Sequence, residues 1–223
     1  MGEKMIFSDI ASYILENLDS ISVIVASGAA IWGVKSWRRE AKWKRKYELG
    51  EEVLSLFYEA RDKIRLIRIP IVLPGETKDP RKAIAQLADY FYPGEITIKR
   101  YNDNIKTFNK IYSLKYRFEA VFGKIKKEKN PFDLLYNLMQ EILGAAQTIE
   151  LDYEALTKIE VLTEIPNNQI SPNSAKKRDE IMKRIEKNKK IIWAGNSEDD
   201  PIEKEVNKIV RNIEDICRPI LQK

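Results

Sequence analysis

The sequence predicts an all-α protein in which an N-terminal transmembrane helix continues into a cytoplasmic bundle of about five to six helices. Apolar residues recur every three or four positions through most of the chain, which is the period of an amphipathic helix. The dipeptides Asp79-Pro80, Asn130-Pro131 and Asp200-Pro201 each join an N-cap residue to a proline at the first helical position, a pair typical of helix starts. Alternating strand patterns are nearly absent, because the only candidate, residues 95–98, is too short to build a sheet.

The predicted membrane anchor occupies residues 1–34. Residues 21–34 read ISVIVASGAAIWGV and contain no charge. These 14 residues are fewer than the roughly 20 that cross a bilayer as a helix, so the predicted span extends back to Tyr13. Tyr13 and Trp32 then stand 19 residues apart, about 28 Å along a helix, which puts an aromatic ring at each interface. The other predicted anchor residues are Ile21, Val25, Ala26, Ala30 and Gly33.

A basic segment that we call the collar follows at residues 35–46. It reads KSWRREAKWKRK, with seven basic residues and one acid, a net charge of +6. The whole chain carries +5, so the remaining residues sum to −1. Basic and aromatic residues beside an apolar run are typical of a membrane interface. We expect these collar residues to contact anionic headgroups: Lys35, Trp37, Arg38, Arg39, Lys42, Trp43, Lys44, Arg45 and Lys46.

The charges also predict a topology. Residues 1–20 carry one lysine and four acids, whereas the collar is strongly basic. Because cytoplasmic segments carry the excess of Lys and Arg, we expect a single-pass protein of the inner (cytoplasmic) membrane with its N-terminus outside. Glu16 and Asp19 then lie near the outer interface, where a charge costs less than at the helix centre.

Two other arrangements remain open for residues 1–34: a helix in the plane of the interface, and a core helix of a soluble protein. A core helix has no reason to end in seven cations, which favours the spanning helix. The collar could also contact nucleic acid, which binds Arg, Lys and aromatic residues. Its position beside the apolar run favours lipid, and we do not expect nucleic acid as a partner.

The third predicted segment is a helical bundle at residues 47–223. A stripe of apolar residues follows the collar without a helix breaker, so one long helix is expected to leave the membrane and end before Pro70. Arg61, Arg65 and Arg68 are expected on its solvated side. The stripe consists of Leu49, Val53, Leu56, Ala60, Ile64 and Ile67. Further helices are predicted at residues 80–91, 95–123, 131–162, 175–194 and 201–218, with a polar linker at 164–174.

Residue types limit the chemistry. The chain has no histidine, which excludes Ser/His and Cys/His dyads and histidine-ligated zinc. Its one cysteine, Cys217, lies on an apolar helical stripe, where a packed thiol is expected. Acids 198–200 precede a helix and are expected to act as cap and dipole charges, while Glu150 and Glu154 are expected in solvent. We therefore predict no catalytic residue, no metal site and no cofactor.

Three segments, GEEVLSLFYEARDKIRLIRIP, YSLKYRFEAVFG and ICRPI, resemble those of uncharacterised bacterial proteins with one N-terminal membrane helix and a cytoplasmic helical region. The resemblance brings no assigned activity. The architecture is also similar to membrane accessory proteins of RNA-targeting CRISPR systems, which carry a divergent HEPN-like bundle and oligomerise. HEPN ribonucleases use an arginine followed four to six residues later by histidine, so the resemblance implies no RNase chemistry for a chain without histidine.

Three functions follow as hypotheses. The first is a non-enzymatic, membrane-anchored interaction or assembly protein that binds an unidentified protein or itself. The second is an oligomeric, membrane-perturbing or pore-forming accessory protein of phage defence. Small residues four apart, Ala26 with Ala30 and Ala29 with Gly33, permit close helix packing in a homo-oligomer. The third is an RNA-binding, degenerate HEPN-like module without nuclease activity.

Overall fold

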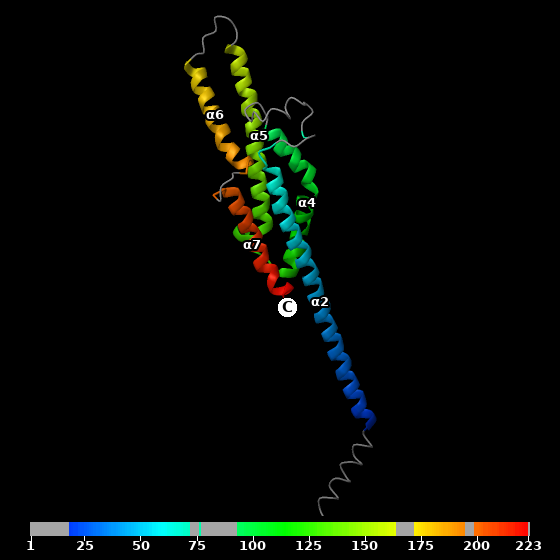
Figure 1. Cartoon of the computed structure of the whole chain (residues 1–223). Coiled ribbons are helices and arrows are strands. Elements are labelled where there is room, and N and C mark those ends of the chain that lie inside the picture. The colour runs from blue at the N-terminus through cyan, green and yellow to red at the C-terminus, as the bar shows by residue number, and fades with distance from the viewer. Residues whose placement is uncertain (1–17, 72–75, 77–92, 164–171, 195–198, 223) are drawn as a thin grey trace, which may run out of the picture. The chain divides into compact units, whose positions relative to one another are not determined.

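The computed structural model describes residues 18–71, 76, 93–163, 172–194 and 199–222 (Figure 1). The described residues form five α-helices, a short 3₁₀ turn (Lys127–Lys129) and no strand, which confirms the all-α class. The helices are α2 (Leu18–Ile67), α4 (Pro93–Phe122), α5 (Pro131–Thr163), α6 (Pro172–Ile192) and α7 (Pro201–Leu221). The chain divides into two compact units, Met1–Glu48 and Leu49–Lys223, and each is described by itself.

The helix boundaries agree closely with those expected. Helix α2 ends at Ile67, ahead of Pro70, as predicted. The predicted helix at 80–91 lies outside the described residues. Helix α5 begins at Pro131 and α7 at Pro201. Asp200 accepts hydrogen bonds from the backbone nitrogens of Ile202 (2.9 Å) and Glu203 (3.3 Å), so the predicted N-cap is confirmed.

The core of the second unit lies between residues 49–67 of α2 and helices α4, α5 and α7. The predicted apolar stripe of α2 is buried, with no member more than 7% exposed. Phe57 of α2 packs edge-on against Phe132 of α5, with 5.3 Å between the ring centroids. Phe118 of α4 lies 5.3 Å from the same Phe132 ring. These aromatic contacts join three helices around one apolar interior, and each such side chain contributes about 1.5–3 kcal/mol by leaving water.

Polar contacts along the helices show the direction in which neighbours run. Tyr58 of α2 donates a hydrogen bond to Glu214 of α7 at 2.5 Å, and Arg65 of α2 pairs with Glu203 of α7. The α2 numbers rise while the α7 numbers fall, so the two helices are antiparallel. Helices α4 and α5 are antiparallel by the same argument, since their contacts link residues 115 with 133 and 95 with 150.

Helix α6 packs along the C-terminal half of α5. Ile181 and Ile185 of α6 form a buried cluster with Leu156. Farther along, Ile192 packs with Ala146 and Ile149. The two helices therefore form an antiparallel hairpin (Figure 1), and α6 buries its isoleucine stripe against α5.

Candidate functional site

The first unit contains an apolar helical segment whose side chains are exposed. All described side chains from 22 to 34 are exposed, including Ile24 at 71% and Trp32 at 68%. A methyl group added at Gly28 or Gly33 would meet no atom within 4 Å. Contiguous apolar surface is rare on soluble monomers and marks a binding site for a protein or a membrane.

The predicted anchor residues fall within this segment where the structure describes them. Val25, Ala26, Ala30, Trp32 and Gly33 are exposed residues of α2. Ile21 belongs to α2, but its side chain and all of Tyr13 lie outside the described part of the chain. Among the described residues, no helix combines the length and the apolar character needed to cross a bilayer.

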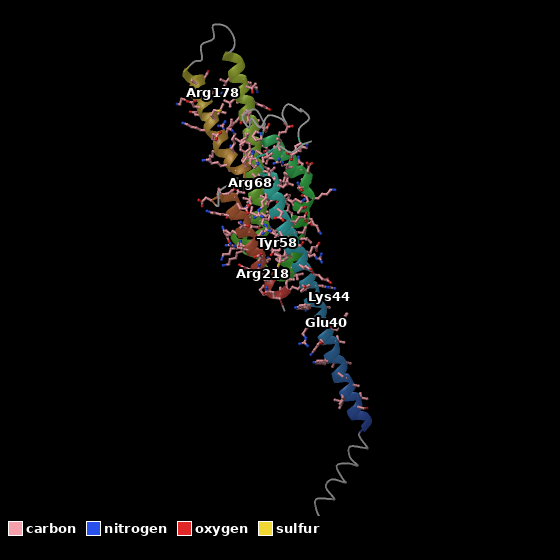
Figure 2. All side chains as sticks on the ribbon, in the orientation of Figure 1. Glu40, Lys44, Tyr58, Arg68, Arg178 and Arg218 are labelled. Carbon is pink, nitrogen blue, oxygen red and sulfur yellow. The ribbon has the colours of Figure 1, made fainter. Side chains whose placement is uncertain are left out.

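The collar carries its cations mainly on one side of α2. Besides Lys35, five of its seven basic residues follow at spacings of 3, 4, 7, 10 and 11 residues from Lys35, and such spacings share a helix face. Lys44 is on the other side and lies 4.0 Å from Glu48 (Figure 2). Trp37 and Trp43 are exposed, and the Trp43 ring lies 5.3 Å from that of Tyr47. The collar therefore presents a basic face, and its exposed tryptophan rings lie on other sides of the helix.

In the second unit, Arg68 forms a buried polar centre rather than part of a solvated face. It is only 1% exposed, so the sequence-based placement in solvent was wrong. Its guanidinium donates to the carbonyl oxygens of Ile191 (2.8 Å) and Trp193 (3.0 Å) and forms a 2.9 Å ion pair with Asp200 (Figure 2). Helix α6 ends at Ile192, and its last carbonyls lack helical partners. Arg68 supplies donors to this end of α6 and to the cap of α7.

The charge of Arg68 also shifts the titration of its partner. Burial by itself raises the pKa of the Asp200 carboxyl. The hydrogen bond and the positive charge from Arg68, with the backbone donors at Glu203 and Ile202, outweigh burial and hold this pKa below its usual value. The lowered pKa favours the ionised form of Asp200, which caps α7.

Arg100 plays the same role at the end of α2, although this role was not predicted from the sequence. Its guanidinium donates to the carbonyl oxygens of Ile69 (2.6 Å) and Ile71 (2.5 Å) and pairs with Glu76 at 2.6 Å. A signal existed, because Arg100 lies 8 and 11 residues before the buried Phe108 and Ile111. Those spacings put Arg100 on the apolar stripe of its helix.

The start of α4 packs closely against α5. Glu150 accepts a hydrogen bond from the backbone nitrogen of Glu95 at 2.9 Å, so it caps the start of α4 instead of lying in solvent as expected. Burial raises the pKa of Glu150, and the backbone donors oppose this shift. A methyl group at Gly94 would lie 2.2 Å from the carbonyl oxygen of Ala146. Only glycine fits at this position.

Two further side chains that could carry chemistry, Cys217 and Asp152, are both buried. Cys217 is fully buried, which confirms the expected packed thiol, and burial raises its pKa to about 12. Asp152, also buried, pairs with Arg184 of α6. Within the described ranges, no group of three or more Cys, Asp or Glu side chains is placed to hold a metal ion.

In comparisons with known proteins, no family model, no curated protein and no solved structure matches this chain. The resemblance to bacterial membrane proteins and to HEPN-like accessory proteins therefore stays a prediction.

Proposed function

We propose that this chain is a membrane-anchored, non-enzymatic protein whose helical second unit serves as an interaction or assembly module. The exposed apolar segment at residues 22–34, followed directly by the collar, is the observation that carries the proposal. The anchor would also include residues 13–21, whose side chains lie outside the described part of the chain.

The energetics favour lipid as the cover of the apolar segment. Transfer of one large aliphatic or aromatic side chain from water to an apolar phase contributes about 1.5–3 kcal/mol. Six such side chains are more than half exposed in residues 22–34: Val23, Ile24, Val25, Ile31, Trp32 and Val34. Their combined transfer outweighs the cost of Glu16 and Asp19 near an interface, since each would cost about 2.5–3.5 kcal/mol even at a helix centre.

The collar supports the same partner and favours one orientation. Each Lys or Arg near an anionic leaflet contributes about 1 kcal/mol. Exposed Trp37 and Trp43 suit the interface, where indole rings concentrate. A cytoplasmic collar leaves the N-terminus outside and the second unit in the cytoplasm.

A structural rather than catalytic role fits the buried charges of the second unit. Arg68 and Arg100 bind helix ends, Asp200 caps α7 and Asp152 pairs with Arg184. Each of these groups is engaged in holding helices together. The second unit would thus act through its surface, concentrated at the membrane by the anchor.

Fractionation of expressing cells tests the proposal. The full chain should sediment with membranes and stay there after washes with high salt and alkaline carbonate, whereas a chain lacking residues 1–34 should appear in the soluble fraction. A collar variant with Lys42, Lys44 and Lys46 changed to Gln serves as control and should remain with the membrane after carbonate. Release of the full chain by high salt alone would contradict an embedded anchor.

A homo-oligomeric membrane assembly is the second candidate. Ala26, Ala29, Ala30 and Gly33 are all exposed on α2, so both pairs of small residues are accessible for close helix contact. The mass of the protein in detergent micelles decides: a mass near one chain argues against an oligomeric pore, and a multiple supports it.

A further inference from the structure

All of the net charge of the collar lies on one side of α2, which we call the basic face. Successive residues of an α-helix are about 100° apart around its axis. Six collar cations therefore fall within an arc of about 120° that no other collar residue shares. These six are Lys35, Arg38, Arg39, Lys42, Arg45 and Lys46. The other collar residues include one acid, Glu40, and one cation, Lys44, so they sum to zero.

The side of the helix opposite the basic face has mixed charge. Glu40 and Lys44 are each two residues from Lys42 and so about 160° from it around the helix. Lys44 lies 4.0 Å from Glu48, and both side chains are exposed. A ring of anionic headgroups around an upright helix would attract cations on every side. The one-sided distribution is instead expected of a helix that turns one side toward an anionic surface.

The basic face is also longer than a headgroup layer is thick. Lys35 and Lys46 stand 11 residues apart, about 16 Å along the helix. One headgroup layer is about 5–7 Å thick, half the difference between the whole bilayer and its hydrocarbon core. An upright helix would therefore hold the far half of the basic face beyond the headgroups.

A leaning helix removes this mismatch. Membrane helices lean by up to about 40°, and at that angle the rise along the basic face falls to about 12 Å. When the basic face is turned downward, its side chains come a further 3–4 Å nearer the membrane, roughly the helix radius times the sine of the angle. Long Lys and Arg side chains also reach toward the interface. The whole basic face then meets one leaflet.

Lipid fits the basic face better than other acidic partners do. The face follows directly after the exposed apolar segment at residues 22–34, whose transfer to lipid is favourable. Proteins that bind single-stranded nucleic acid place aromatic rings beside the cations, but Trp37 and Trp43 lie outside the basic face. Protein interfaces are depleted in lysine and have an apolar centre, whereas this face consists of cations alone.

We propose that anionic phospholipid headgroups bind along the basic face, and that residues 18–48 of α2 lean with this face toward the leaflet. The inference rests on the proposed function, because only an embedded anchor holds the collar beside headgroups. It deepens that function by giving the collar one lipid-binding side. The opposite side, with Glu40 and Lys44, stays in water.

Depth measurements at three collar positions test the proposal in the full chain. K42C, K44C and R45C each replace one exposed cation and accept a thiol-reactive fluorophore, whereas the native Cys217 is buried and stays unlabelled. The labelled proteins are reconstituted into vesicles of phosphatidylcholine and phosphatidylglycerol with nitroxide quenchers on the headgroups of both leaflets. Quenching at positions 42 and 45, on the basic face, should exceed quenching at position 44.

The order of quenching separates a leaning helix from an upright one. In an upright helix, quenching falls steadily with distance from the apolar segment, in the order 42, 44, 45. In a leaning helix, position 45 is nearer the headgroups than position 44, although it is farther along the chain. In vesicles of phosphatidylcholine alone the steady order should return, because the anionic headgroups are absent.

Two charge variants provide a matched control. Each cation near an anionic leaflet favours contact roughly fivefold. K42Q, combined with the R45C probe, should therefore lower the ratio of leaning to upright helices about fivefold and reduce quenching. K44Q removes the same charge from the opposite side and should leave quenching at the R45C probe unchanged.

The proposal is overturned if quenching falls in the order 42, 44, 45 in the anionic vesicles, or if K44Q reduces quenching as much as K42Q does. It is also overturned if an added DNA or RNA duplex shields positions 42 and 45 while phosphatidylglycerol does not. Quenching of Trp32 by lipids with brominated acyl chains reports separately on the anchor. Absence of Trp32 quenching contradicts the proposed function, whereas Trp32 quenching with the steady order contradicts this inference alone.

Discussion

Helix α2 contains two apolar stretches that are used differently. In residues 22–34 apolar side chains occupy every side of the helix and all described side chains are exposed. In residues 49–67 they form one stripe, which is buried against α4, α5 and α7. An apolar stripe is typical of a helix that packs on one side, whereas a helix apolar all round needs cover all round. The pattern of apolar residues along the helix, more than their number, therefore indicates what covers them.

The largest expected difference comes from an isoleucine-to-aspartate substitution made in each of the two stretches. Ile64→Asp puts an unpaired charge into the core and should destabilise the second unit by about 4 kcal/mol or more. Ile24→Asp should leave the thermal unfolding of the second unit unchanged, because residue 24 is exposed, and should instead reduce membrane retention, since a central Asp costs about 2.5–3.5 kcal/mol. Circular dichroism melts and fractionation measure the two effects; a similar melting loss for both variants would contradict the comparison.

Arg65 and Arg68 lie one turn apart, and their substitutions compare an exposed ion pair with a buried one in the packed part of the chain. Arg68→Ala leaves Asp200 buried without its cation and should cost about 3–5 kcal/mol of unfolding free energy. Arg65→Ala removes an exposed pair with Glu203 and should cost no more than about 1 kcal/mol. Denaturant titrations of both variants check this ranking, and equal losses would show that Arg68 is not a central contact.

Glycine substitutions compare tight with open packing. Gly94→Ala forces its new methyl group against the Ala146 carbonyl and should cost about 1–3 kcal/mol, as overpacking does. Gly144→Ala meets nothing within 4 Å and should stabilise α5 by up to about 1 kcal/mol. Gly28→Ala in the exposed segment should leave the melting temperature of the second unit unchanged. A stable Gly94→Ala variant would show that α4 and α5 approach less closely.

Low pH should lower the stability of the second unit through two carboxyl groups, Asp200 and Glu203, which pair with arginines near the end of α2. The pKa of Glu203 is lowered, chiefly by the hydrogen bond from Arg65, and that of Asp200 is lowered as described above. Since the unfolded chain binds these protons more readily, their stabilisation is complete above the ordinary values of 4.5 and 3.8 and is lost as pH falls through the lower folded values. Melting temperatures measured across this range should fall with pH, and Asp200→Asn should flatten the curve.

The smallest expected effect concerns a buried hydroxyl. The Tyr112 oxygen is buried and has no hydrogen-bond partner among the described residues. Tyr112→Phe removes this unsatisfied group and should leave stability unchanged or raise it by about 1 kcal/mol. A clear loss in a denaturant titration would show that the hydroxyl has a partner.

Local patterns in the sequence were sufficient to predict most helices and their caps. Asp200 and Asn130 precede Pro and cap through their own side chains, so a few neighbouring residues determine the helix start. Contacts between distant segments were not predictable in this way. Arg68 meets residues more than 120 positions away, and no pattern near it in the sequence identifies those partners.

The net positive charge of α6 was missed for a related reason. The residues outside the collar have a net charge of −1. This total hides the +5 charge of α6, because all other residues outside the collar sum to −6. Pairing also decides which cations remain unneutralised, and pairing depends on the fold: Arg184 meets Asp152, 32 residues away. The prediction of the anchor rests on the apolar pattern of residues 21–34 and on the exposure of residues 22–34.

The most direct test of the anchor uses the four tryptophans of the chain, Trp32, Trp37, Trp43 and Trp193. Two single-tryptophan variants, W37F/W43F/W193F and W32F/W37F/W43F, are reconstituted into vesicles with bromines on the lipid acyl chains, which quench indole fluorescence at short range. The account predicts strong quenching of Trp32 in the first variant and none of Trp193 in the second. Equal, weak quenching of both tryptophans would show that the apolar segment is not embedded in lipid.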